Sequence, residues 1–278
     1  MTTIAMLGLG SMNGAILAGL LAGGVPAENV VATSRSAASA QQRSHQYGVR
    51  VLSEEADGAA NITAVTDADV VLLGVKPHQI TDVCEQIKDA LRPDAVVVSV
   101  AAAVTVQMME SRMEPGQPVV RAMPNTPMSV GAGVVGIAVG AHVSQDQTET
   151  VAQLLGSSGS VHVLDEAQID ALTGVAGSGP AYAFYLAEHM AAAGVEMGLS
   201  PELAADLAAQ TIYGAGKMLV ENRGAADAAQ LRTNVTSPNG TTQKALETFD
   251  AHGMAEAITA GAKASAARAA EITEQLRG

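Results

Sequence analysis

The chain has 278 residues, of which 48% are hydrophobic and 15% are charged, and its formal net charge is −13. A chain this apolar has enough side chains to build a sizeable core, which excludes global disorder. The acidic balance without a basic patch argues against nucleic-acid binding, because such proteins neutralise phosphates with Lys and Arg. Any anionic ligand must therefore be held by local donors against an unfavourable overall field.

Cysteine and histidine usage excludes two further kinds of site. Cys84 is the only cysteine, so we predict no disulfide framework and no cysteine-based zinc site. The six histidines do not fall at metal-ligand or triad spacing, and we predict no metal. The chain opens directly into an apolar segment without a basic leader, and its longest low-charge run, residues 95–109, is too short for a membrane span. We expect a soluble, cytoplasmic protein without a membrane or nucleic-acid partner.

Short β-branched runs alternate with helix-length stretches in the first half of the chain. Strands are predicted at residues 3–8, 29–34, 49–52, 69–75, 95–100, 118–123, 133–139 and 161–164. Such alternation implies right-handed crossovers and a mostly parallel sheet. We therefore predict an α/β fold with a Rossmann-type, doubly wound sheet over residues 1–164.

The strand pattern stops at about residue 165. Helices are predicted at residues 181–197, 200–222 and 253–276. Gly198 can cap the first, and the second has Ser200 as its N-cap and Pro201 at the first helical position. We predict an all-helical C-terminal domain over residues 165–278.

The segment GLGSMNG begins at Gly8, between the first predicted strand and the first helix. Gly8 and Gly10 fit the tight turn that brings the backbone close to a pyrophosphate at the helix N-terminus. Asn13 stands at the third-glycine position, with Gly14 one residue later, and this departure weakens the fingerprint. A lone Gly-x-Gly is often only a tight turn, but its place in the first βαβ unit favours dinucleotide binding.

The end of the second predicted strand indicates which dinucleotide is bound. It reads ATSRSAAS, with Ser34, Arg35 and Ser36 and no acid before Glu54. An NAD site has a carboxylate here for the ribose diol, whereas a 2′-phosphate requires donors. Arg35 can make charge-assisted bonds to that phosphate, although a solvated surface arginine is the simpler alternative. We predict NADPH as the cofactor, with NADH as the weaker expectation.

Two patterns in the helical half point to other reductase families. Tyr213 and Lys217 have the Tyr-x-x-x-Lys spacing of short-chain dehydrogenases, but the glycine motif is not of that type. The β-hydroxyacid dehydrogenases have an asparagine four residues after a helical lysine, where this chain has Glu221. We interpret these side chains as helix surface and core.

Four segments, in this order along the chain, resemble the pyrroline-5-carboxylate reductase family. They are Val75-Lys76-Pro77, Met123–Pro127, Gly177–Tyr182 and Ser237–Thr242. The family has Val-Lys-Pro, Met-Pro-Asn-Thr-Pro, Gly-Ser-Gly-Pro-Ala-Tyr and Ser-Pro-Gly-Gly-Thr-Thr at these places, and the resemblance runs the length of the chain. Asn239 stands where the family has glycine. Asparagine tolerates a left-handed backbone, so we expect the turn to survive.

The resemblance implies reduction of 1-pyrroline-5-carboxylate to L-proline by hydride transfer from NADPH, the last step of proline biosynthesis. One alternative is an NADP-dependent reductase of another small carboxylate-bearing imine or hydroxy acid. Another is a non-catalytic nucleotide sensor, although the intact substrate loop counts against it. Because the family intertwines the helical domains of two subunits, we expect a C-terminal dimerisation domain and a homodimer or dimer-based higher oligomer.

The segment VTSPNGTT, residues 235–242, is predicted to bind the substrate carboxylate. Small residues at a helix N-terminus present N–H groups to an anion, and the absence of Lys and Arg here suits a carboxylate. We assign this role to the amides of Gly240, Thr241 and Thr242. The simpler alternative is that one threonine only caps the helix.

The resemblance also implies which side chains act in the reaction. The Thr242 hydroxyl would face the ring nitrogen, and Asn234 and Glu166 would line the same pocket. Thr242 and Glu166 are the predicted catalytic residues, unless the iminium is protonated in solution and no general acid is required.

The cofactor-binding residues implied by the resemblance lie along the predicted strand ends. Among them, Asn61 is expected to reach the adenosine ribose and its phosphate. The full set is Gly8, Leu9, Gly10, Ser11, Met12, Asn13, Ser34, Arg35, Asn61, Val75, Lys76, Pro77 and Ala101.

Overall fold

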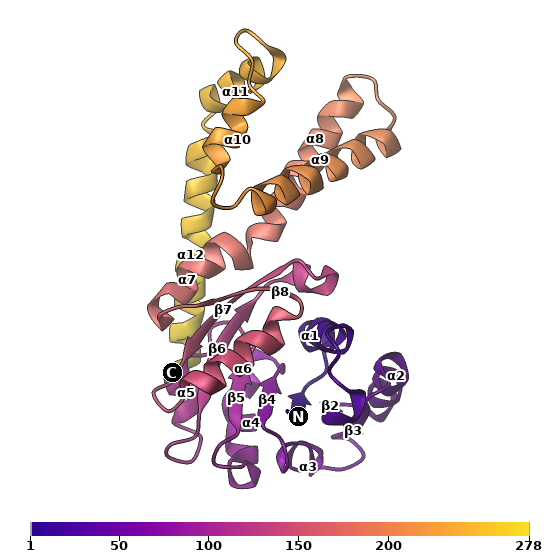
Figure 1. The fold of residues 1–278 in the computed structure, drawn as a ribbon, viewed down its shortest axis with the longest axis vertical. Helices are drawn as coiled ribbons and strands as arrows, with labels where there is room; N and C mark the ends of the chain where they lie inside the picture. Colours follow the sequence, from indigo (N-terminus) through magenta and orange to yellow (C-terminus); the bar gives the residue numbers. More distant parts are fainter. Residues whose placement is uncertain (1, 278) are drawn as a thin grey trace. The chain divides into compact units, whose positions relative to one another are not determined.

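The computed structural model describes residues 2–277, and its chain folds into two compact units (Figure 1). The first unit runs to Gly177 and also includes the C-terminal residues from Ser265 onward. The second unit comprises Ser178–Ala264. Residues 165–177 thus belong to the same unit as the residues before them, and a functional boundary at residue 164 remains a prediction.

The first unit contains one sheet of eight strands, as the apolar runs predicted. The strands are β1 (Ile4–Leu7), β2 (Val30–Ser34), β3 (Arg50–Ser53), β4 (Val70–Leu73), β5 (Val96–Ser99), β6 (Val119–Pro124), β7 (Gly133–Val139) and β8 (Gly159–Val163). Their order is β3-β2-β1-β4-β5-β6-β7-β8, and every pair is parallel except β6–β7. This confirms the doubly wound, mostly parallel fold.

The helices fall into two groups that follow the two units, except that the last helix begins in the second unit and its residues from Ser265 belong to the first. The sheet is accompanied by α1 (Ser11–Ala22), α2 (Ala37–Tyr47), α3 (Ala60–Val65), α4 (Ile80–Ile87), α5 (Val106–Glu110), α6 (Gln145–Gly156) and α7 (Ile169–Leu172). Later in the chain come α8 (Gly179–Glu196), α9 (Pro201–Glu221), α10 (Ala228–Asn234), α11 (Thr241–Ala251) and α12 (Met254–Arg277). No helix of the described chain combines the length and the apolar character needed to cross a bilayer.

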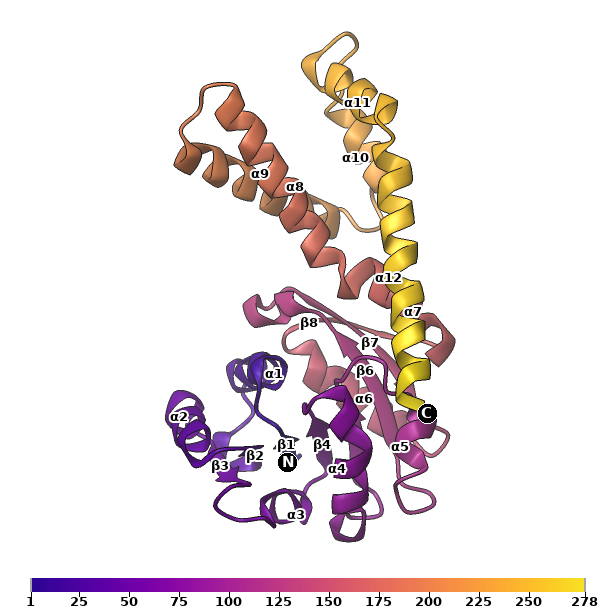
Figure 2. The ribbon, with the colours of Figure 1, turned by 180° about the vertical axis from the view of Figure 1, so that it is seen from behind.

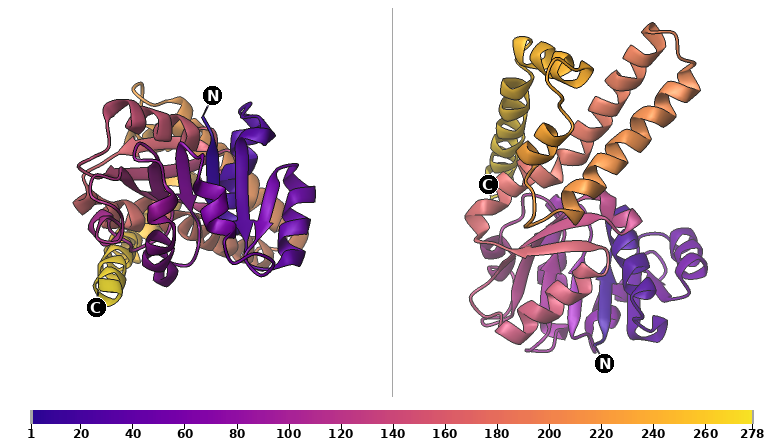
Figure 3. Two further views of the ribbon diagram at one scale, coloured as in Figure 1. Left: turned by 90° about the horizontal axis from the view of Figure 1, so that it is seen from below. Right: turned by 45° about the horizontal axis from the view of Figure 1, so that its top comes forward.

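Both faces of the sheet are buried because successive side chains of a strand point to opposite sides. Met6 and Leu72 belong to one core cluster, with Leu17 of α1 and Val151 of α6. Their strand neighbours, including Leu7, belong to a second cluster with residues of α3 and α4. Accordingly, α6 lies in front of the strands in Figure 1, α4 lies in front of them in Figure 2, and helices flank the sheet on both sides in Figure 3. Strands buried on both faces explain the near-continuous apolar runs.

In the second unit, α8 and α9 form an antiparallel pair, seen side by side in Figure 3. A Cβ at Gly194 would lie 3.1 Å from the Cβ of Ala204, so small residues allow this close approach. The turn between them contains Gly198 at φ +101°. Ser200 accepts the Leu203 N–H at 3.3 Å, which confirms it as the N-cap.

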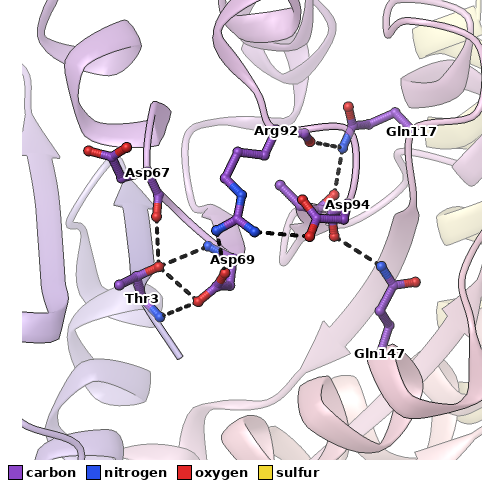
Figure 4. A network of polar contacts seen from close by, with 8 residues as sticks. Thr3, Asp67, Asp69, Arg92, Asp94, Gln117 and Gln147 are labelled. Carbon is purple, nitrogen blue, oxygen red and sulfur yellow. Dashed lines mark hydrogen bonds and ion pairs between the residues drawn. The ribbon is translucent and has the colours of Figure 1, made fainter. Parts of the chain in front are cut away.

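A polar network ties together the amino-terminal ends of three strands (Figure 4). The backbone N–H and the hydroxyl of Thr3 donate to Asp69 Oδ2 at 2.8 and 2.9 Å. Arg92 donates to Asp69 Oδ1 at 2.7 Å and to Asp94 Oδ2 at 2.9 Å. Partial burial raises the pKa of Asp69, but the bonds from Thr3 and the charge of Arg92 outweigh it, so the pKa lies below its usual 3.8.

Replacing Asp69 with Asn tests this network. Because the folded-state pKa is depressed, the ionised carboxylate stabilises the fold above its unfolded pKa, and this contribution is lost as the pH falls through the folded pKa. We expect Asp69→Asn to lower the free energy of unfolding at pH 7 by about 1 kcal/mol, a value reduced by solvent screening. In urea titrations the difference from wild type should persist from pH 7 down to about pH 5 and shrink as the pH falls below ~4. Equal stabilities at pH 7 would contradict the assignment.

Candidate active site

The turn between β1 and α1 is shaped by Gly8. Its φ is +76°, a left-handed value that favours glycine, and its N–H donates to Thr33 Oγ1 at 3.1 Å. A Cβ at Gly8 would lie 2.8 Å from Val75 Cγ1, in the segment that follows β4. Leu9 is buried and donates its N–H to the carbonyl of Thr33 at 2.8 Å. The turn is therefore held between the neighbouring strands β2 and β4.

The next residues leave the N-terminus of α1 open. Gly10 is the N-cap without a side-chain cap bond, and a Cβ built on it would meet no atom within 4 Å. Ser11 is exposed, Met12 is half-buried, and the first turn of α1 has no acidic residue. Because the first-turn N–H groups lack intrahelical partners, this cradle fits a phosphate group.

Asn13 explains how the chain manages without the third glycine. Its buried Nδ2 donates to the carbonyls of Leu7 and Gly8 at 3.3 Å and of Leu72 at 3.4 Å, so the amide bridges β1 and β4. A Cβ at Gly74 would overlap this amide, so Gly74 provides the space that Asn13 fills. The sequence pattern marked Asn13 as a departure, and the structure gives it a structural role.

The close packing of helix α1 depends instead on the glycine one residue later. A Cβ at Gly14 would lie 2.8 Å from the hydroxyl oxygen of Tyr47 in α2. Gly14 therefore lies against the end of the Tyr47 side chain.

The predicted 2′-phosphate site lies at the end of β2. Ser34 is buried, and its hydroxyl oxygen has no hydrogen-bond partner within the described chain. Arg35 is exposed, and Ser36 caps α2 by accepting the Ser39 N–H at 3.2 Å. The Ala37 N–H donates to Glu55 Oε2 at 2.9 Å. Donors and one acidic side chain therefore meet at this strand end.

Asn61 is buried rather than open to the adenosine side. Its Nδ2 donates to Glu54 Oε2 at 3.3 Å and to Gln86 Oε1 at 3.0 Å. Its Oδ1 is buried and, among residues 2–277, has no partner. A contact between Asn61 and the cofactor remains a prediction, and it requires the side chain to turn away from Gln86.

The remaining predicted cofactor residues follow β4 and β5, at the same edge of the sheet as Gly8. Val75 is half-buried against Gly8, Lys76 is exposed, and Pro77 begins a 3₁₀ turn. Ala101 is buried and donates its N–H to Ser99 Oγ at 3.2 Å. In this fold, dinucleotides bind at the carboxyl ends of adjacent parallel strands.

Glu166 has partners that sequence reasoning did not identify. Its Oε1 accepts the Val106 N–H at 2.8 Å, at the start of α5, and lies 3.3 Å from Arg121 Nη1. The other guanidinium nitrogen lies 3.6 Å from Asp170 Oδ1. The Arg121 side chain is 5% exposed, and a buried cation is costly unless it is paired. Glu166 therefore neutralises Arg121, and its predicted contact with substrate remains a prediction.

Two of the four family-like segments contact each other. Asn125 donates from Nδ2 to the carbonyl of Ala176 at 3.0 Å and accepts the Val134 N–H at 2.8 Å. A Cβ at Gly177 would lie 2.9 Å from the terminal methyl carbon of Met123. The segment after β6 and the turn before α8 thus form one packed element.

The turn before α11 adopts the predicted left-handed conformation, because Asn239 has φ +59°. Gly240, not a threonine, is the N-cap, and no side chain caps the helix. The Gly240 N–H donates to the carbonyl of Ser237 at 3.0 Å. The N–H groups of Thr241 and Thr242 belong to the first helical turn, which leaves them without intrahelical acceptors.

Asn234 is the exposed last residue of α10, just before this turn. Its Oδ1 accepts from Gln230 Nε2 at 2.8 Å. Thr242 is half-buried and Thr241 is exposed. Lys217, which had suggested other families, forms an exposed ion pair with Glu221 at 3.6 Å.

Three contacts near the candidate site escaped sequence reasoning, and only the first had a signal in the sequence. Arg121 is a lone cation inside an apolar strand, which is a sign of a buried ion pair. Gly74 directly follows β4 and complements Asn13, but a pattern cannot show which side chain fills the space. Glu55 lies far from Ala37 in the chain, and only β2–β3 pairing brings the two together.

Comparisons with known families agree with this geometry. Residues 3–103 match the family described as "NADP oxidoreductase coenzyme F420-dependent". Residues 166–272 match the family described as "Pyrroline-5-carboxylate reductase dimerisation". With the doubly wound sheet and the open glycine turn, these matches define the chain as a Rossmann-type NAD(P)-dependent oxidoreductase.

Individual relatives are more specific. The chain is 40% identical over 274 residues to "Pyrroline-5-carboxylate reductase" of Pseudomonas aeruginosa, covering 98% of this chain and 97% of that one. A solved pyrroline-5-carboxylate reductase from Coxiella burnetii is similar with a TM-score of 0.89 and 34% identity, over 97% of this chain and 98% of that one. A Plasmodium falciparum pyrroline carboxylate reductase solved with NADP bound shares the fold, with a TM-score of 0.84 and 24% identity over 98% of both chains. The chain belongs to the pyrroline-5-carboxylate reductase family.

The Asn13–Gly74 contact predicts a pair of coupled substitutions. Gly74→Ala should lower the free energy of unfolding by about 1–3 kcal/mol, because the new methyl group overlaps the Asn13 amide. In the double variant with Asn13→Gly, the loss should be smaller than the sum of the two single losses. Gly58→Ala is the control, since a Cβ there would meet no atom within 4 Å. Strict additivity in urea unfolding would contradict the packing described.

Proposed function

We propose that the protein is a cytoplasmic NADPH-dependent enzyme that reduces 1-pyrroline-5-carboxylate to L-proline, the last step of proline biosynthesis. The observation that carries the proposal is the turn at residues 237–242, which keeps its left-handed residue and its first-turn amides although Asn239 replaces glycine. The absence of Lys and Arg from this turn suits a carboxylate-bearing substrate. Membership of the family over almost the whole chain supports the same activity.

The first unit supplies the cofactor site in this proposal. When bound, NADPH supplies the hydride. The α1 N-terminus beyond Gly10 holds the pyrophosphate, and Ser34 and Arg35 hold the 2′-phosphate. Val75 and Ala101, which follow adjacent strands, line the path of the nicotinamide end. Positioning dominates catalysis of this kind, because the cofactor carries the reactive group.

The second unit supplies the substrate site. The N–H groups of Thr241 and Thr242 bind the carboxylate, while the Gly240 N–H keeps the turn closed through Ser237. The reaction adds a hydride to the imine carbon and a proton to the ring nitrogen. The Thr242 hydroxyl donates or relays that proton, or orients an iminium already protonated in solution. Asn234 lies beside this loop in the chain and lines the pocket.

We assign Glu166 an electrostatic role, in which it offsets positive charge, rather than the role of a general acid. Its Oε1 already accepts the Val106 N–H and pairs with Arg121, which suits Glu166 to offsetting positive charge rather than to transferring a proton. The Glu166→Gln variant distinguishes the roles. An unchanged pH–rate profile would remove Glu166 from the proton transfer.

Activity with NADPH and pyrroline-5-carboxylate tests the function. We expect oxidation of NADPH at 340 nm, slower oxidation of NADH, and a loss of about 10²-fold in kcat/KM for Thr242→Ala. Thr241→Ala is the matched comparison, because it removes the adjacent hydroxyl and keeps the N–H, so its loss should be much smaller. If the protein binds NADPH but shows neither turnover nor a response to proline, a nucleotide sensor would be favoured. Turnover of another cyclic imine alone would favour a reductase of another small carboxylate-bearing imine.

Self-association is the second part of the proposal, supported by the apolar surface of the helical unit. A groove of about 660 Å³ runs between α8, α11 and α12, lined mainly by apolar and aromatic side chains such as Tyr185, Met190 and Ile258. The Phe184 and Tyr185 side chains are 67% and 65% exposed. Apolar surface of this extent is usually covered by a partner, and we assign that partner as a second copy of the chain.

A charge in the groove should weaken the dimer. Tyr185→Glu places a carboxylate on the apolar surface, and we expect at least a tenfold rise in the dimer dissociation constant, measured by light scattering across a dilution series. Gln42→Glu, an exposed change on α2, is the control for added negative charge. A wild-type protein that is monomeric at all concentrations would refute self-association.

A further inference from the structure

The N-terminus of α2 is already occupied by an acidic side chain of the protein. The Ala37 N–H donates to Glu55 Oε2 at 2.9 Å. Ala37 is the first residue of α2 and follows the strand end that holds Ser34 and Arg35. We propose that Glu55 competes with the 2′-phosphate of the cofactor for this strand end and thereby narrows the preference for NADPH over NADH. This inference rests on the proposed use of NADPH.

Backbone pairing fixes Glu55 beside this site. The Glu54 N–H donates to the carbonyl of Ser34, and the Glu55 N–H donates to the carbonyl of Arg35, both at 3.0 Å. These bonds continue the β2–β3 ladder one step beyond the strands. Glu55 therefore belongs to the same local framework as the predicted phosphate donors, and its carboxylate reaches across to the helix.

Glu54 and Glu55 make different side-chain contacts. The Glu54 carboxylate accepts from Asn61 Nδ2 at 3.3 Å and so serves the packing of α3. Glu55 is exposed, and its carboxylate accepts the Ala37 N–H. Glu54 is thus the natural comparison, since it carries the same charge one residue away.

Electrostatics makes the competition specific for the phosphorylated cofactor. A phosphate monoester carries about −1.5 to −2 charges at pH 7, and the N-terminal N–H groups of a helix favour one anion. The 2′-phosphate must displace the Glu55 carboxylate or bind next to it, and either costs affinity. A cofactor with a free 2′-hydroxyl adds no anion here and leaves the bond to Ala37 in place. Glu55 therefore changes the ratio of the affinities for NADPH and NADH.

Binding of cofactor fragments to the full-length protein tests the proposal without turnover. The probes are 2′,5′-ADP and 5′-AMP, measured by titration calorimetry. We expect Glu55→Gln to tighten 2′,5′-ADP binding by about three- to tenfold and to change 5′-AMP binding less than about twofold. Glu54→Gln should change the ratio of the two dissociation constants less than Glu55→Gln does. An equal ratio in wild type and Glu55→Gln would overturn the proposal.

A second substitution tests whether the competition passes through the Ala37 N–H. Ala37→Pro removes this N–H at the first helical position, which accepts proline, and Ser36 already has the extended backbone required before proline. In the Ala37→Pro background, the fold-increase in 2′,5′-ADP affinity caused by Glu55→Gln should fall by at least about half. An undiminished gain would overturn the direct contact.

The two proposals fail in different ways. If wild type binds both probes equally, the NADPH preference is wrong, yet Glu55→Gln must still create a preference for 2′,5′-ADP if Glu55 competes. If wild type prefers 2′,5′-ADP and Glu55→Gln leaves that preference unchanged, the cofactor assignment stands and the role of Glu55 is wrong. Thermal unfolding of each variant identifies any change that only affects folding.

Discussion

The turn between β1 and α1 packs closely against the segment after β4, and the proposed cofactor site depends on this contact. Gly8 leaves no room for a side chain against Val75, and the Asn13 amide donates to the carbonyls of Leu7 in β1 and Leu72 in β4. These contacts fix where α1 begins, and so where its unpaired N–H groups point. An anion site at a helix N-terminus depends on that placement more than on any single charged residue.

Sequence reasoning predicted the features that follow from periodicity and from local backbone chemistry. All eight strands, the end of the sheet near residue 165, the Ser200 cap and the left-handed Asn239 were predictable because each depends on neighbouring residues. The contacts that the structure shows for Asn13 and Glu166 were not predicted, because both involve partners distant in the chain. Gly74 follows β4 and contacts Asn13 of α1, whereas Arg121 lies in β6 and pairs with Glu166 beyond β8. No local pattern reports such contacts.

Charge compensation is a common theme of the residues around the site. Buried Arg121 is balanced by Glu166 and Asp170, while exposed Glu55 is placed where the protein otherwise offers donors to an anion. In a chain with net charge −13, local donors must attract anionic ligands against the overall field. A change in the carboxylate that pairs with a given N–H group can therefore alter the preference for a ligand without altering the fold.

The last helix has a consequence for the order in which the protein is assembled. Residues of α12 up to Ala264 belong to the helical unit, whereas those from Ser265 belong to the unit that contains the sheet, where Leu276 packs against the second core cluster. Ribosomal synthesis delivers the whole helical unit before Leu276. The core of the nucleotide-binding unit is therefore completed only after its companion unit has been made, and the nascent chain must carry an unfinished hydrophobic surface until then.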